Sequence, residues 1–264
     1  MREALPNLDV LYNGPVITSQ EQEALLNEFA LRSFRDVADG DYIAARMAYR
    51  AQLYIQALWA SQQALEKYIK AILLLRRIEW KKASHSLQKP LERLEQNLPL
   101  DLSKDVRNFI QFIDEWDADR YFTYSYGLGG LELLRLDRSV WEIRRYCIPY
   151  NRGKTPKGTS IEAIDLEHIH NAHNHSPQHY SPILAGFLDE VLRDGNSSAR
   201  QALVWQNLYF GKSSRRSIRN FQQHHYSANS PLALYYDDLL DAVAKYVYLP
   251  PKIRPATLKS PPPE

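Results

Sequence analysis

Apolar residues recur every three or four positions between Leu53 and Arg77, and neither glycine nor proline interrupts the stretch. This spacing predicts one amphipathic helix. A helix of about 25 residues spans roughly 37 Å at 1.5 Å per residue, which is long enough for the central member of a helical bundle. The apolar stripe consists of Tyr54, Ala57, Leu58, Leu65, Tyr68, Ile69, Ile72 and Leu75. The opposite face is expected to be solvated and carries Gln52, Gln56, Gln63, Glu66, Lys67 and Lys70.

Similar spacing predicts helices through most of the remaining chain, so the fold class is expected to be all-α. Ser19 followed by acidic residues resembles a capped helix start, and Asp39-Gly40-Asp41 is expected to end this first helix and to cap the next. A helical stretch is expected to begin at Tyr42 and to continue into the long helix. Further helices are expected at 90–98, 103–117, 131–147, 161–170, 182–193, 199–209 and 232–249. The expected organisation is an arm at 1–18, a helical bundle at 19–148, a His/Pro-rich connector at 149–181, a helical C-terminal region at 182–250 and a Pro-rich tail at 251–264.

Composition excludes several classes of protein. The net charge of +2 is too small to indicate nucleic-acid or membrane binding by the molecule as a whole. No apolar run approaches the roughly 18 residues that a membrane span requires, and the start of the chain is not that of a signal peptide. A single cysteine, Cys147, excludes a disulfide within one chain and fits a cytoplasmic location.

Cys147 follows two arginines, which permits two interpretations. Neighbouring cations could lower the pKa of the thiol, or the side chain could be buried and inert, and we favour burial. Arg144 and Arg145 stand at the end of a predicted helix, where they would complement its dipole.

The stretch from about Phe34 to Cys147 resembles a HEPN domain, the nucleotide-binding helical bundle of higher eukaryotes and prokaryotes. The resemblance rests mainly on the pattern Gln-Gln-Ala-x-Glu-Lys-x-x-Lys-Ala-x-Leu-x-Leu, which begins at Gln62. The stretch from Ala38 to Arg46 supports it. Lys82 and His85 match the family's Lys–His connector, and Arg120-Tyr121 matches its later Arg-Tyr.

The resemblance implies an up-and-down bundle that commonly dimerises. Many members are metal-independent endoribonucleases, often toxins, and others are non-catalytic partners of nucleotidyltransferases. Catalytic members carry Arg, a polar residue and then His four to six positions further on. Residues 34–147 of this chain lack that pattern.

The pattern does occur later, in Arg219-Asn-Phe-Gln-Gln-His224-His-Tyr226. Histidine can accept the proton of a ribose 2′-hydroxyl, and arginine can stabilise the charge that develops on the phosphate. We therefore identify Arg219, His224 and Tyr226 as candidate catalytic residues. Polar packing and helix capping would also account for them.

Positive charge is concentrated just before this motif, in Lys212, Arg215 and Arg216. Aromatic residues alternate with these cations, a pattern that can hold phosphates and stack bases. We expect these three cations, with Lys82, His85 and Arg120, to contact phosphate; a solvated basic loop is the alternative.

A second cluster suggests different chemistry, because five histidines fall within 168–179 beside Asp165 and Glu167. Their spacing matches no zinc template, so we expect neither a metal nor another cofactor. Three hypotheses remain. The leading one is a HEPN-type protein that binds RNA or a nucleotide, acts as a homodimer and cleaves RNA. The others are a non-catalytic helical partner of a nucleotidyltransferase or defence complex, and a metal-dependent hydrolase.

Overall fold

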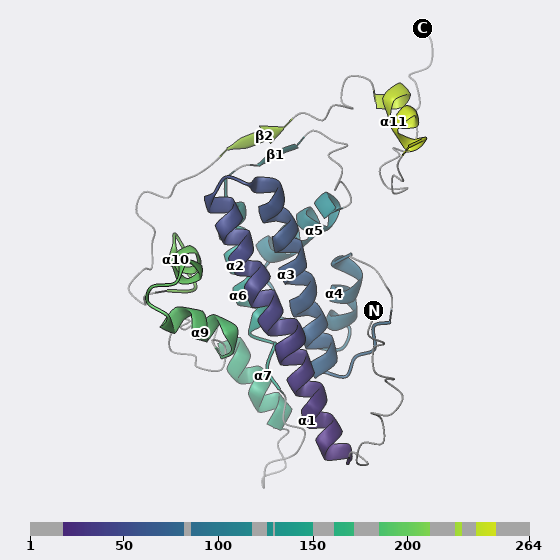
Figure 1. Cartoon of the computed structure of the whole chain (residues 1–264). Coiled ribbons are helices and arrows are strands. Elements are labelled where there is room, and N and C mark those ends of the chain that lie inside the picture. The colour runs from purple at the N-terminus through teal and green to yellow at the C-terminus, as the bar shows by residue number, and fades with distance from the viewer. Residues whose placement is uncertain are drawn as a thin grey trace, which may run out of the picture.

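The computed structural model of the chain describes residues 18–81, 86–117, 126–128, 130–149, 161–171, 185–211, 225–228 and 236–246. Within these ranges the regular structure is helical except for one two-stranded ribbon (Figure 1). The elements are α1 Ser19–Phe29, the π-helix η2 Ala30–Arg35, α2 Asp36–Arg50, α3 Tyr54–Leu75, α4 Gln88–Glu95, α5 Lys104–Asp117, β1 Tyr126–Leu128, α6 Glu132–Arg144, α7 Ile161–Asn171, α9 Phe187–Arg193, α10 Ser198–Val204, β2 Tyr226–Ala228 and α11 Tyr236–Ala244. This confirms the predicted all-α, up-and-down bundle with a helical C-terminal extension.

α1, η2 and α2 form one continuous helical rod that lies antiparallel to α3 (Figure 1). Its start is a capping box, in which Thr18 Oγ1 accepts from the backbone of Glu21 and Glu21 accepts from the backbone of Thr18. The cap is therefore Thr18, and the prediction of Ser19 was wrong by one residue.

The predicted break at Asp39-Gly40-Asp41 is also wrong, because the helix passes through these residues without interruption. The chain reverses later, at Gln52, whose φ of 62° lies in the left-handed region. The backbone N–H of Leu53 then donates to the carbonyl of Ala48, the closure that commonly ends a helix.

α3 is the central helix, as predicted, and it contacts η2, α2, α4, α5 and α6. Every residue of the predicted apolar stripe is buried. The opposite face is less exposed than predicted, because Glu66 is only 5% exposed. Glu66 accepts from Lys70, four residues further along the helix, at 2.5 Å, although Glu66 lies inside the protein.

Two buried ion pairs join α2 to α6. Asp39 on α2 pairs with Arg144 on α6 at 2.6 Å, and Arg46 on α2 pairs with Asp137 on α6. All four side chains are at most 1% exposed. On each helix the acid precedes the base by seven residues, so an antiparallel arrangement satisfies both pairs at once.

The C-terminal extension binds to the same groups. Arg46 donates to the carbonyls of Ala202 and Trp205, and Arg144 donates to the carbonyl of Ala185 at 2.7 Å. α9 and α10 accordingly pack against α2. Arg144 lies in the last turn of α6, the helix end at which it was predicted to complement the dipole, and it is also a buried residue that joins three segments.

Two buried tyrosines complete the network. The hydroxyl of Tyr68 donates to Asp39 at 2.6 Å, and that of Tyr42 donates to Asp137 at 2.7 Å. Burial, reinforced by the adjacent carboxylate, raises the pKa of each phenol well above its usual value. Both hydroxyls therefore remain hydrogen-bond donors at neutral pH.

Cys147 is 1% exposed beside this network. Burial raises the pKa of its thiol to about 12, so the thiol is protonated at neutral pH. The interpretation of Cys147 as a buried, inert side chain is confirmed.

We expect Asp39→Ala to destabilise the protein by about 3–5 kcal/mol, because it leaves the Arg144 guanidinium buried without its counter-ion. Urea denaturation followed by circular dichroism measures this change in the free energy of unfolding. Asp105→Ala is the matched control, since Asp105 pairs with Arg138 at the surface and is 67% exposed. Its loss is expected to cost at most about 1 kcal/mol. Equal losses for the two variants would contradict the structural role of the buried pair.

Candidate nucleic-acid interface

The β1–β2 ribbon joins two segments that are about a hundred residues apart in the sequence. Its antiparallel register pairs Tyr126 with Ala228, Gly127 with Ser227 and Leu128 with Tyr226. The ribbon lies across the end of the bundle where α2 turns into α3 (Figure 1). The end of the predicted motif is therefore held against the bundle.

Tyr226 attaches the ribbon to the bundle through aromatic contacts. Its ring lies 4.9 Å from that of Tyr54, between centroids, and Tyr54 packs edge-on against Tyr49 at 5.4 Å. Tyr49 donates to the carbonyl of Gly130 at 3.3 Å, and the N–H of Gly130 donates to Glu132 at 2.9 Å. These contacts connect the ribbon to α2, α3 and the start of α6.

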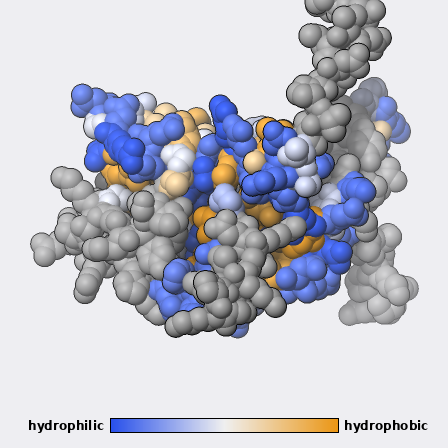
Figure 2. All heavy atoms as spheres, turned by 90° about the horizontal axis from the view of Figure 1, so that it is seen from below, coloured by the Kyte–Doolittle hydropathy of each residue, from blue (hydrophilic) through white to orange (hydrophobic). Residues whose placement is uncertain are grey.

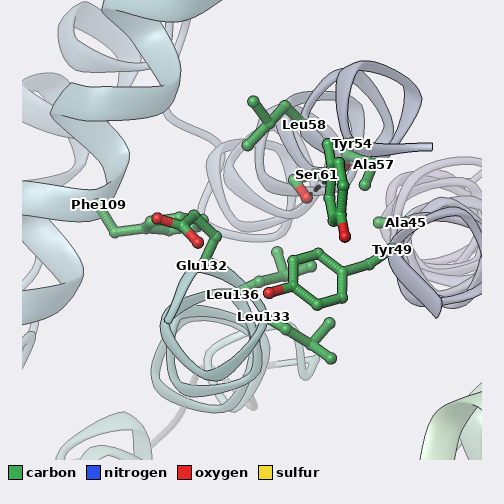
Figure 3. Close-up of a pocket in the computed structure, with 10 residues that line it drawn as sticks. All are labelled: Ala45, Tyr49, Tyr54, Ala57, Leu58, Ser61, Phe109, Glu132, Leu133 and Leu136. Carbon is green, nitrogen blue, oxygen red and sulfur yellow. Dashed lines mark hydrogen bonds between the residues drawn. The ribbon is translucent and has the colours of Figure 1, made fainter. Parts of the chain in front are cut away.

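A small cavity lies under this tyrosine cluster, lined by side chains from α2, α3, α5 and α6 (Figure 3). Its volume is about 10 Å³, which is enough for one water molecule and far too small for a nucleotide. Burial and the nearby carboxylate of Glu132 raise the pKa of Tyr49, so its hydroxyl does not ionise near neutral pH. The cavity is therefore a packing feature and cannot hold a nucleotide.

A second anchor, Phe210, precedes the segment that carries the cations Lys212, Arg215 and Arg216. The Phe210 ring is 1% exposed and lies 5.7 Å from Tyr42 and 6.0 Å from Trp141, between centroids. Its N–H donates to the side chain of Asn207. The segment 212–224 thus starts two residues after a buried anchor and ends two residues before Tyr226.

Tyr226 is the one predicted site residue that the described ranges contain. Its ring contact with Tyr54 gives it a packing role in addition to the predicted chemical one. The other predicted residues lie outside the described residues: Lys82, His85, Arg120, Lys212, Arg215, Arg216, Arg219 and His224. Their site roles remain predictions.

The described neighbours of these residues lie at different places. Lys81, just before Lys82, lines a groove at the C-terminal end of α3, whereas Tyr226 contacts Tyr54 at its N-terminal end. An α-helix as long as α3 separates these ends by roughly 30 Å. Because β1 and β2 are antiparallel, the first residue of β1, Tyr126, and the first residue of β2, Tyr226, lie at opposite ends of the ribbon.

Sequence reasoning did not identify two contributors to this surface. Tyr54 holds the ribbon, and exposed Arg50 lies over the ring of Trp205 at 5.6 Å. Such a stacked, solvent-facing guanidinium can also contact phosphate. The apolar stripe had assigned Tyr54 to the core, and no sequence pattern connects Arg50 with a residue 155 positions away.

Comparison with known families identifies the bundle. The family model described as "HEPN domain" matches residues 31–139. This part of the chain is a HEPN domain. No curated protein and no solved structure matches the chain. The HEPN match contains the central helix and Asp39, Arg46 and Asp137 of the buried network, and it ends before Arg144. The basic segment and Tyr226 lie outside it.

The histidine group shows no metal site in the part of the chain that the structure describes. No group of three or more His, Cys, Asp or Glu side chains is placed to hold a metal there. His168 and His170 lie on α7, and His170 Nε2 is 3.1 Å from the carbonyl of Pro99. His173, His175 and His179 lie outside the described residues.

None of the described helices is long and apolar enough to cross a membrane.

We expect Tyr226→Phe to preserve the ribbon and Tyr226→Ala to loosen it, because the ring makes the contact with Tyr54. The aromatic pair contributes about 0.5–1.5 kcal/mol, so hydrogen exchange of the ribbon amides should accelerate roughly 2- to 12-fold in the alanine variant. Tyr246→Ala is the control, since Tyr246 is 86% exposed. Unchanged exchange in Tyr226→Ala would show that the ring is not an anchor.

Proposed function

We propose that this HEPN-domain protein binds RNA or a nucleotide through the basic segment 212–219 and cleaves RNA without a metal ion. The observation that supports this most directly is the pair of anchors, Phe210 and Tyr226, on either side of the segment. Four cations lie between them in the sequence: Lys212, Arg215, Arg216 and Arg219. A basic segment with both ends attached loses less conformational entropy on binding phosphate than a free tail would.

In the proposed reaction, His224 accepts the proton of the 2′-hydroxyl, whose oxygen attacks the adjacent phosphorus. Arg219 stabilises the charge that develops on the phosphate oxygens. The bond to the 5′-oxygen breaks and that oxygen takes up a proton. The products are a 2′,3′-cyclic phosphate and a 5′-hydroxyl, and the reaction needs no cofactor. Toxin or defence activity in the cytoplasm, as a homodimer, would fit the HEPN resemblance.

A second candidate function is a non-catalytic helical partner of a nucleotidyltransferase or defence complex. The buried network favours it, because Arg46 and Arg144 are both engaged in structural ion pairs and do not face a substrate. His85 is also the only histidine of the matched region, and no arginine precedes it at the catalytic spacing. Under this hypothesis the basic segment would bind without cleaving.

We expect the wild-type protein to cleave a single-stranded RNA in the presence of EDTA and to leave 2′,3′-cyclic phosphate ends. His224→Ala should lower the rate at least 100-fold, because general-base catalysis contributes about 10²–10⁴-fold. His225→Ala is the matched control; the exposed neighbouring imidazole is expected to be dispensable. Absent cleavage, or equal rates for wild type and His224→Ala, would reject catalysis at this residue.

Binding can be tested separately from cleavage. We expect Arg215→Gln with Arg216→Gln to weaken binding of a fluorescent RNA oligonucleotide and to reduce the salt slope of log K by about 1.4, because each phosphate contact to a single strand contributes about 0.7. Arg93→Gln with Lys104→Gln, at two exposed cations elsewhere, should leave that slope unchanged. Equal effects of the two double variants would indicate a non-specific surface, and binding without cleavage would support the second candidate function.

A further inference from the structure

A groove lies between η2 and the C-terminal end of α3, at the end of the bundle opposite the β1–β2 ribbon. Its volume is about 620 Å³, which is within the range of sites that hold small molecules. Figure 2 looks onto this end of the bundle and shows hydrophobic side chains between hydrophilic ones. The apolar side chains that line the groove are Phe34, Leu73, Leu74, Ile78 and Trp80.

The end of α3 builds one wall of the groove. Arg77 has a φ of 58°, so the chain turns there in the left-handed region. The N–H of Arg77 donates to the carbonyl of Leu74 at 3.0 Å, and that of Ile78 donates to the carbonyl of Leu73 at 2.8 Å. These two hydrogen bonds define a Schellman motif, which commonly packs the residue after the turn against the last turn of the helix. Ile78 and Leu73 accordingly line the same groove.

An arginine at this turn is unusual, because glycine is favoured where φ is positive. The side chain of Arg77 holds it there. It donates to the carbonyl of Leu74 at 2.6 Å, and to Glu23 and Asn27 of α1 at 2.7 and 2.9 Å. Its buried Nε has no acceptor among the residues that the structure describes. Arg77 therefore joins α3 to α1 and retains one N–H donor without a partner in this part of the chain.

η2 supplies another wall through Phe34. The π-helix is a short segment, Ala30–Arg35, between two α-helices. Such segments have a wider turn than an α-helix and occur frequently at functional sites. The ring of Phe34 packs edge-on against that of Phe29 at 5.7 Å, which restricts its movement. The groove therefore has a held aromatic ring on the side opposite the end of α3.

The polar side chains of the groove are almost all hydrogen-bond donors. Lysine, arginine and the indole of tryptophan donate and do not accept. Among the described residues that line the groove, the one acidic side chain is Glu79, which is 78% exposed. The donors are Lys70, Arg77, Trp80 and Lys81. The best match for such a set is a group that only accepts hydrogen bonds, and a carboxylate is such a group.

Existing ion pairs limit the occupant to one negative charge. Glu66 already pairs with Lys70 at 2.5 Å, and Glu23 pairs with Arg77. Lys81 is 84% exposed and lies 3.5 Å from Glu79, a surface pair that holds it only weakly. The C-terminal end of α3 also adds about half a negative charge beside the groove. A phosphate monoester, with a charge of about −2, therefore fits less well than a single carboxylate.

We propose that this groove binds a small monocarboxylate with an apolar body. The body lies between Phe34 and Trp80, and the carboxylate accepts from Lys81 and from the guanidinium of Arg77. The proposed RNA-binding function does not require this groove, because α3 separates it from the ribbon by roughly 30 Å. Each proposal can therefore fail without the other.

The first test varies the head group of the ligand. Octanoate, octanamide and octylammonium carry the same apolar chain and differ in charge. By isothermal titration calorimetry, octanoate should bind once per chain with a dissociation constant on the order of 0.1–1 mM, and the other two at least about tenfold more weakly. Absence of saturable octanoate binding up to about 10 mM would overturn the proposal. Equal affinities of octanoate and octanamide would overturn it too, since the cations would then have no part in binding.

The second test locates the site with two pairs of matched variants. Trp80→Ala removes an aromatic wall and Lys81→Glu reverses the charge at the head group, so each should weaken octanoate binding at least about tenfold. Trp59→Ala and Lys104→Glu are the controls, because both residues are exposed and neither lines the groove. They should bind octanoate like the wild type. Circular dichroism melts establish that all four variants remain folded. Equal binding by the groove and control variants would overturn the proposal.

Protein concentration distinguishes a free groove from one that a second copy covers. The affinity for octanoate should be the same at about 20 and 200 µM protein, because the proposed ligand competes with no other molecule. Weaker binding at the higher concentration would show that another copy of the chain occupies the groove, and it would overturn the proposal.

Discussion

The architecture depends on two ion pairs buried between α2 and α6, Asp39 with Arg144 and Arg46 with Asp137. Burying four charged groups is favourable only when each finds a partner and its remaining hydrogen-bonding positions are filled. Tyrosine hydroxyls and backbone carbonyls fill many of them. Because the acid precedes the base on both helices, a parallel arrangement would bring like charges together, and a shift by one turn would separate the partners. The pairs therefore fix the orientation and the register of α2 against α6.

The same arginines determine where the C-terminal extension lies. A guanidinium has five N–H donors, and a single carboxylate cannot accept them all. The backbone carbonyls of Ala185, Ala202 and Trp205 accept hydrogen bonds from further N–H groups of the two arginines. The chain around α9 and α10 therefore supplies acceptors that the buried arginines need. This docking places Phe210 beside Trp141, next to the start of the basic segment. The buried network and the candidate nucleic-acid interface are thus coupled through residues 185–211.

Periodicity was sufficient to predict the elements but not their polar interior. The stripe of α3 and most helix limits followed from apolar spacing, because burial of apolar area dominates helix packing. Asp39-Gly40-Asp41 misled the prediction because acid–glycine sequences favour caps, whereas here Asp39 meets a cation more than a hundred residues away. The seven-residue spacing of Asp39 and Arg46, mirrored by Asp137 and Arg144, was the available signal. Contacts such as Tyr226 with Tyr54 leave no trace in local sequence.

The dependence of the core on residues beyond the family match has a consequence for any shortened form of the protein. A fragment cut at 31–139 would keep Asp39 and Arg46 but would lose Arg144 and the carbonyls of Ala202 and Trp205. It would contain an unneutralised aspartate and an arginine short of acceptors, both in its interior. The residues that match the family model are therefore fewer than those that complete the buried network of this chain, and the residues beyond the match contribute to the stability of its core.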